Sequence, residues 1–259
     1  MQSLLEKATA AVLEAGEIIR ESYNKPKKIK HKGRIDLVTE TDLAVEKFLK
    51  AKLAEILPGS SFLAEETSGD AELVDRTWII DPLDGTTNFA HGLPMVATSV
   101  ALWDSGQVVL GIVNLPILNE IFTAARGGGA FMNGEPIHVS DCGSLEESLI
   151  ATGFPYAIEE HVDFITDALS RVLVKTQGVR RPGAAAFDLA YTACGRYEGY
   201  YENSLKPWDM AAGWLLVEEA GGRVTEYGLG EFNLYSPMIL ATNAHIHEQL
   251  DGLIQPKLI

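Results

Sequence analysis

The chain has 259 residues, of which 46% are hydrophobic and 22% charged, so it is long enough for one large domain or two packed halves. Its formal net charge of −15 at pH 7 disfavours nucleic acids and anionic membrane surfaces as partners. The N-terminus does not resemble a secretory signal, and no apolar run of about 18 residues predicts a membrane span. Two cysteines are too few for a disulfide scaffold. We therefore expect a cytoplasmic protein.

The N-terminal segment predicts two amphipathic helices with a basic, turn-rich stretch between them. Apolar side chains recur at helical spacing over residues 2–22, and again from residues 39–42 to residue 57. Thr39 and Asp42 resemble a capping pair at the start of the second helix, and Pro58-Gly59 would end it.

From residue 61 the pattern changes to strands, and the turns between them predict an antiparallel meander. Extended runs cover residues 61–66, 77–81 and 96–134, with turns at 104–106, 118–119 and 127–129. After about residue 140 strands and helices alternate; we expect strands at 147–152, 176–180, 197–202, 222–226 and 237–242, and helices at 159–174, 185–195, 209–220 and 244–254. The chain therefore predicts a mixed α/β fold of the α+β class, with an antiparallel half followed by an alternating half.

The segment WIIDPLDGTTNF, residues 78–89, carries the clearest chemical signal. An apolar strand runs into Asp81, we expect Pro82 to force the chain out of the sheet, and Asp84 follows. Two carboxylates at a strand end are suited to Mg²⁺, which prefers oxygen ligands. Gly85 would let the backbone approach a ligand, and the free N–H groups of a helix that begins just after it would face an anion. One loop could thus hold both a metal ion and the phosphate that the metal attracts.

Two further acidic positions could complete such a site. Glu65-Glu66 follows the apolar run SFLA, and Asp209 follows the rigid Lys206-Pro207-Trp208 at the start of an apolar helix. Each acidic residue also has a purely structural interpretation, because an Asp at a helix start or in a turn is often only a cap. The residue pattern alone leaves both interpretations open.

Three segments resemble signatures of the inositol monophosphatase family. These segments are AEET at 64–67, WIIDPLDGTTNF at 78–89 and KPWDMAAGWLLVEEAGG at 206–222. The resemblance covers nearly the whole chain, from DLVTETD at 36–42 to the helix after residue 244. The family belongs to the lithium-sensitive, Mg²⁺-dependent phosphatases, which include fructose-1,6-bisphosphatases. It implies one domain over residues 1–259 that folds as a layered αβαβα sandwich, two packed halves at about 1–140 and 141–259, and a homodimer.

The resemblance also implies roles for individual residues. One Mg²⁺ would be held by Glu65, Asp81 and the backbone carbonyl of Leu83, a second by Asp81, Asp84 and Asp209, and a third ion could face Glu65. The catalytic residues would be Asp42 and Thr86, paired beside the attacking water, together with Glu65. The substrate would lie against Gly85 and Thr86 at its phosphate, against Gly183, Ala184, Ala185 and Glu202 at its polyol, and against Asp84 and Asp209 between them.

We therefore expect hydrolysis of a small polyol phosphate, inositol monophosphate first. The open alternatives in the same superfamily are fructose 1,6-bisphosphate, NADP, histidinol phosphate and 3′-phosphoadenosine 5′-phosphate. A bisphosphate would need a basic second pocket, for which Arg180, Arg181 or Lys206 are candidates. In the basic stretch, Lys30, Lys32 or Arg34 could help to screen a phosphate. An alternative of another class is a regulatory binding protein that kept the fold and lost turnover.

Overall fold

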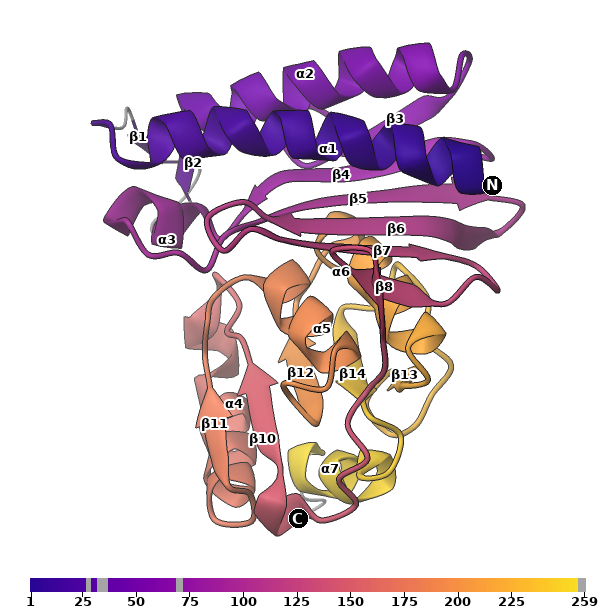
Figure 1. The fold of residues 1–259 in the computed structure, drawn as a ribbon. Coiled ribbons are helices and arrows are strands. Elements are labelled where there is room, and N and C mark those ends of the chain that lie inside the picture. Colours follow the sequence, from indigo (N-terminus) through magenta and orange to yellow (C-terminus); the bar gives the residue numbers. More distant parts are fainter. Residues whose placement is uncertain (27–28, 32–36, 69–71, 256–259) are drawn as a thin grey trace.

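The computed structural model describes residues 1–26, 29–31, 37–68 and 72–255, and these fold into alternating layers of helices and sheets (Figure 1). Two helices cover one face of a seven-stranded sheet, two more lie between this sheet and a five-stranded sheet, and another two pack on the far face of the five-stranded sheet. This order of layers confirms the predicted αβαβα sandwich.

The outer helical layer is made by α1 (Gln2–Tyr23) and α2 (Glu40–Ile56). A two-stranded antiparallel ladder of β1 (Ile29–His31) and β2 (Leu37–Thr39) leads into α2. Thr39 caps α2 as predicted: its hydroxyl accepts the backbone N–H of Thr41, and its own N–H donates to the Asp42 carboxylate at 2.9 Å. The capping box therefore fixes the position of the Asp42 side chain.

The seven strands of the large sheet follow the order of the chain. They are β3 (Ser61–Ala64), β4 (Thr77–Asp84), β5 (Ala97–Asp104), β6 (Gln107–Leu115), β7 (Glu120–Ala125), β8 (Ala130–Met132) and β9 (Glu135–Ile137). From β4 to β9 each neighbouring pair is antiparallel, which confirms the predicted meander. The pair β3 and β4 is parallel, so the N-terminal half is not purely antiparallel.

Alternation of side chains along the strands gives this sheet two buried faces. On β4, Trp78 and Ile80 pack with α1 and α2, whereas Ile79 packs with the helices of the middle layer. Because successive residues of a strand point to opposite faces, a strand covered on both sides is apolar throughout. This double burial explains why residues 77–83 are all buried.

The second sheet contains β11 (Gly178–Arg180), β10 (Leu149–Thr152), β12 (Gly199–Asn203), β14 (Met238–Thr242) and β13 (Arg223–Thr225), in that order. The middle helices are α5 (Ala185–Ala193) and α6 (Pro207–Glu219), and the outer ones are α4 (Ile158–Leu173) and α7 (His247–Ile254). Here too a strand faces both ways: Tyr200 of β12 packs with α5 and α6, and Tyr201 packs with the cluster that includes α7. Within the described ranges, no helix combines the length and apolar character that a membrane crossing requires.

The prediction that Pro82 forces the chain out of the sheet is wrong. Strand β4 runs through Pro82 to Asp84, and its register against β5 shifts between Asp81 and Asp84. The pairing of β4 with β3 ends at Ile80, so the proline removes no ladder hydrogen bond on that edge. A bulge at this point redirects the strand end and brings Asp84 toward the middle layer.

The other differences from the predicted elements are small. The short helix α3 (Thr86–His91) begins where the sequence suggested. The strand β9 was not predicted. The strand predicted at 147–152 begins at Leu149, after a 3₁₀ turn, η1 (Leu145–Glu147). The remaining bounds move by a few residues. Boundaries shift because hydrophobic periodicity defines the middle of an element better than its ends.

Gly111 on β6 lets α6 approach the large sheet closely. A Cβ atom at Gly111 would lie 2.8 Å from the carbonyl oxygen of Ala212 and 3.2 Å from its Cα, both in the backbone of α6. Any side chain there would push away the helix that carries Asp209.

We therefore predict that Gly111→Ala lowers the free energy of unfolding by roughly 1–3 kcal/mol, as overpacking in a core does. Urea unfolding followed by circular dichroism would measure this change. Gly143→Ala is the matched control, because a Cβ at Gly143 meets nothing within 4 Å, and its effect should stay within about 0.5 kcal/mol. Equal effects of the two substitutions would show that α6 tolerates the displacement.

Candidate active site

A cavity of about 580 Å³ opens where both sheets meet the middle helical layer. Its wall is built by the end of β4, the start of α3, the loop after β10, and the starts of α5 and α6. Glu65, Asp81, Asp84 and Asp209 all line it, although more than a hundred residues separate the first from the last. The fold thus gathers into one cavity the acidic residues that the sequence offered separately.

Strand pairing and helix starts position the four carboxylates. Glu65 and Asp81 are neighbours because β3 and β4 are parallel and end at the same edge; the N–H of Glu65 donates to the carbonyl of Ile80 at 3.1 Å. The Asp84 carboxylate accepts the N–H of Ala186, at the start of α5, at 2.7 Å. The Asp209 carboxylate accepts the N–H of Lys206, at the start of α6, at 2.7 Å.

The electrostatics of this cluster are unfavourable unless positive charge is added. Burial raises the pKa of Asp81 well above its usual value, and the neighbouring Glu65, Asp84 and Asp209 raise it further. Burial and the charge of Asp84 likewise raise the pKa of Asp209. The carboxyl groups of Glu65 and Asp81 are in hydrogen-bonding contact. Such a pair must share a proton or bind a cation, since two adjacent carboxylates repel each other.

These donors fit a hard divalent cation such as Mg²⁺. All are oxygen atoms, which Mg²⁺ prefers over nitrogen and sulfur. One oxygen each of Asp81, Asp84 and Asp209 accepts a backbone N–H, which orients these carboxylates in the cavity wall. Among the described residues, no group of three or more His, Cys, Asp or Glu side chains forms a complete ligand set around one point. The cluster therefore supplies the right donors, and ions would still have to draw them together.

A polar pair lies beside the cluster. The Thr86 hydroxyl donates to Asp42 at 3.0 Å and lies 3.1 Å from the carbonyl oxygen of Leu83. Asp42 is fully buried, and burial is the main reason why its pKa is raised. The contact joins α2 to α3 across 44 residues, so the cap of α2 is linked to Thr86, which lines the cavity.

Gly85 and Asn88 shape the floor between the metal-binding candidates and α5. Gly85 has φ +85°, and a Cβ on it would lie 2.8 Å from the carbonyl oxygen of Met95. The side-chain amide of Asn88 donates to the carbonyls of Met95 at 2.7 Å and Pro182 at 2.8 Å. Asn88 thus ties α3 to the loop that leads into α5, a role that was not predicted from the sequence.

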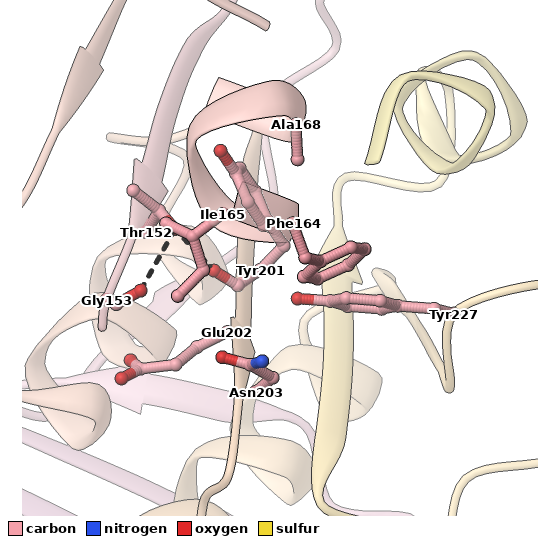
Figure 2. Close-up of a pocket in the computed structure, with 9 residues that line it drawn as sticks. All are labelled: Thr152, Gly153, Phe164, Ile165, Ala168, Tyr201, Glu202, Asn203 and Tyr227. Atoms are coloured by element: carbon pink, nitrogen blue, oxygen red, sulfur yellow. Dashed lines mark hydrogen bonds between the residues drawn. The ribbon is translucent and has the colours of Figure 1, made fainter. Parts of the chain in front are cut away.

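At the other end of the cavity, Glu202 is held by two neighbours. The Tyr200 hydroxyl donates to the Glu202 carboxylate at 2.5 Å. That carboxylate occupies the space that a side chain on Gly153 would need. Figure 2 shows the Glu202 side chain pointing away from the aromatic pair of Phe164 and Tyr227. Burial raises the pKa of Glu202 to about 7, and the Tyr200 hydrogen bond opposes that rise.

A sequence model of the inositol monophosphatase family matches residues 1–258. The chain belongs to the inositol monophosphatase family. Relatives include inositol monophosphatase 2 of Solanum lycopersicum, 44% identical over 96% of each chain, and Nus factor SuhB of Pseudomonas aeruginosa, 43% identical over 100% of this chain and 98% of that protein. The crystal structure of the extragenic suppressor protein SuhB from Bartonella henselae superposes with a TM-score of 0.93 at 37% identity, over 99% of this chain and 100% of that one.

Membership in the family places the chain among phosphoric monoester hydrolases, which are generally metal-dependent. The predicted family and the predicted enzyme class are thereby confirmed. The structure brings Gly183, Ala184, Ala185 and Glu202 to the same cavity as Gly85, Thr86 and the acidic cluster, as the resemblance implied. Lys32 and Arg34 lie outside the described residues, and so does the side chain of Lys30. Gly153 and Tyr200, which hold Glu202, were not predicted; their contacts leave no local pattern in the sequence.

One further buried acid lies behind this wall. Asp188 on α5 is buried, and both of its carboxyl oxygens lack a hydrogen-bond partner among the described residues. Burial raises its pKa well above the ordinary 3.8, and the charges of Glu202 and Asp84 add to the rise, while Arg181 opposes it. Asp188 is therefore expected to keep its proton in the folded protein at neutral pH.

We predict that Asp188→Asn stabilises the protein, and increasingly so as the pH rises. The unfolded chain releases the Asp188 proton above about pH 3.8, while the folded protein keeps it until its raised pKa is reached. Wild-type stability relative to the variant should then fall by up to about 1.4 kcal/mol per pH unit across that window. Urea unfolding of both proteins between pH 5 and 8 would measure the slope. Asp141→Asn, at an exposed acid, controls for the loss of one charge. A difference that does not change with pH would mean that Asp188 is ionised.

Proposed function

We propose that this chain hydrolyses the phosphate monoester of a small polyol, with inositol monophosphate as the expected substrate. The observation that carries the proposal is the meeting of Glu65, Asp81, Asp84 and Asp209 in one cavity. That cavity also contains Gly85 and Thr86 at one side and Glu202 at the other. An acidic cluster, a backbone turn open to phosphate oxygens and a carboxylate for hydroxyl groups are together suited to one phosphorylated polyol. The names of the curated relatives agree with this substrate class.

In the proposed mechanism, Glu65, Asp81, the Leu83 carbonyl, Asp84 and Asp209 would hold two Mg²⁺ ions, and a third could face Glu65. Bound there, the ions would supply positive charge for water activation and for the leaving alkoxide. The Thr86 hydroxyl, which donates to Asp42 at 3.0 Å, would receive the proton of the attacking water while passing its own to Asp42. The N–H groups of Gly85 and Thr86 would bind phosphoryl oxygens as charge develops on them.

The polyol would be oriented at the opposite wall. A carboxylate accepts hydrogen bonds from hydroxyl groups, and Glu202 is fixed for this by Tyr200. Gly183, Ala184 and Ala185 present little side chain, so the ring of the substrate can approach the backbone at the start of α5. Asp84 and Asp209 would lie between the ring and the ions.

The remaining proposals rest on the family. We propose a single domain over residues 1–259, a homodimer, inhibition by Li⁺ at the second metal position, and a location in the cytoplasm. The free Cys142 and Cys194 suit a reducing compartment. The second candidate function is regulatory binding without turnover. The name of the relative Nus factor SuhB suggests this alternative. A measurement of turnover separates the two.

The proposed function predicts that phosphate release from inositol 1-phosphate needs Mg²⁺. EDTA should abolish the activity and excess Mg²⁺ should restore it, because the acidic cluster repels a phosphate when no cation is bound. Asp81→Asn should lower kcat by about a hundredfold or more, since ions at such sites contribute several kcal/mol. A colorimetric phosphate assay measures both effects. Full turnover in metal-free buffer would contradict the proposal.

The inositol assignment predicts a selective effect of Glu202→Gln. A hydrogen bond to a charged group is worth roughly 1.5–3 kcal/mol, so kcat/KM for inositol 1-phosphate should fall by about tenfold or more. The aryl ester p-nitrophenyl phosphate has no hydroxyl group for Glu202 and should lose much less. Steady-state kinetics on both esters give the comparison. Equal losses on the two would mean that Glu202 supports the site and does not bind the polyol.

A further inference from the structure

Arg181 provides positive charge in the wall of the cavity, in the loop between β11 and α5. Its side chain is exposed, and its guanidinium carbon lies 5.2 Å from the centroid of the Phe154 ring. Arg126, Arg171 and Arg196 each pair with a carboxylate, but no salt bridge to Arg181 is found among the described residues. Stacking on an aromatic face leaves the N–H groups at the edge of a guanidinium available for a ligand.

The contacts of Arg181 place it at the Glu202 end of the cavity. Phe154 directly follows Gly153, whose missing side chain makes room for the Glu202 carboxylate. The charge of Arg181 lowers the pKa of Glu202 and of Asp188. Gly183, with φ +90°, leaves space for the guanidinium, because a Cβ there would collide with Arg181. Arg181 therefore lies at the polyol end of the site.

The cavity is also larger than one ring with one phosphate needs. A volume of about 580 Å³ lies within the range that encloses drug-sized ligands. The lining of the cavity also includes Phe154, Tyr156 and Arg181, and Lys206 adds a second cation. In a chain of net charge −15, two cations in the lining of one cavity mark a place for negative charge.

We propose that the site has a second anion-binding subsite, in which the Arg181 guanidinium binds a further phosphate or carboxylate group on the polyol portion of the substrate. The inference rests on the proposed function and extends its substrate class to phosphorylated polyols that carry a second anionic group. A guanidinium suits such a group because its N–H fork matches two oxygens of a phosphate or carboxylate. Glu202 would bind the hydroxyl groups between the two anions.

The test compares inositol 1-phosphate with inositol 1,4-bisphosphate in wild type, Arg181→Gln and Arg180→Gln. Arg180 is the matched control: it is the adjacent exposed arginine, its guanidinium donates to the carbonyl of Val179 at 3.1 Å, and it does not line the cavity. We expect Arg181→Gln to lower the ratio of kcat/KM for the bisphosphate to that for the monophosphate by about tenfold, mainly through KM. Arg180→Gln should leave the ratio within about twofold of wild type. An unchanged ratio in Arg181→Gln, or an equal fall in both variants, would overturn the subsite.

Failure of the proposed function gives a different result. If wild type with Mg²⁺ releases no phosphate from either ester or from p-nitrophenyl phosphate, the hydrolase proposal fails. The same bisphosphate is then titrated into the three proteins by calorimetry. Binding about tenfold weaker in Arg181→Gln than in wild type and Arg180→Gln would support the subsite, and equal affinities would overturn it.

Discussion

The repulsion among four acidic side chains in one partly buried cluster is the constraint on which the candidate site depends. Glu65, Asp81, Asp84 and Asp209 would each gain stability by moving into water, yet the fold holds them together. Two helix starts offset part of the cost, because α5 donates a backbone N–H to Asp84 and α6 donates one to Asp209. The positive end of a helix dipole favours a carboxylate at both places. The remaining cost would give the cluster an affinity for cations.

The packing of the middle layer follows from the same requirement. Helices α5 and α6 can direct their first turns at the cluster only if they lie close to the large sheet and to each other. Gly111 permits the first contact, and Gly213 permits the second, because a side chain on it would collide with Leu189. Small residues in the core thus determine where Asp209 lies. A displaced helix would move a carboxylate away from its partners, so core packing would also affect the metal affinity that we propose for the cluster.

The source of the compensation for the acidic side chains differs between the two ends of the cavity. At the metal end only cations from solution can neutralise the carboxylates. At the polyol end the protein supplies its own compensation: Tyr200 donates to Glu202, Arg181 lowers the pKa of Glu202, and Asp188 can remain protonated behind them. This asymmetry separates the two tasks that we propose for the site. The acidic end attracts ions and phosphate, and the balanced end selects the group that carries the phosphate.

The sequence by itself determined the elements, the family and the identity of the acidic residues, because these depend on local signals. Hydrophobic periodicity predicted the helices and the meander, and the Thr39–Asp42 pair predicted the cap of α2. The segment from Trp78 to Phe89 identified Asp81, Asp84 and Gly85 as candidate site residues. Only the tertiary structure decided how β4 passes through Pro82, which requires knowing where β3 stops pairing. It also decided the hydrogen bond between Asp42 and Thr86, the space that Gly153 leaves for Glu202, and the stacking of Arg181 on Phe154. Each of these contacts joins separate elements, and its geometry depends on how whole layers pack, for which no local propensity carries a signal.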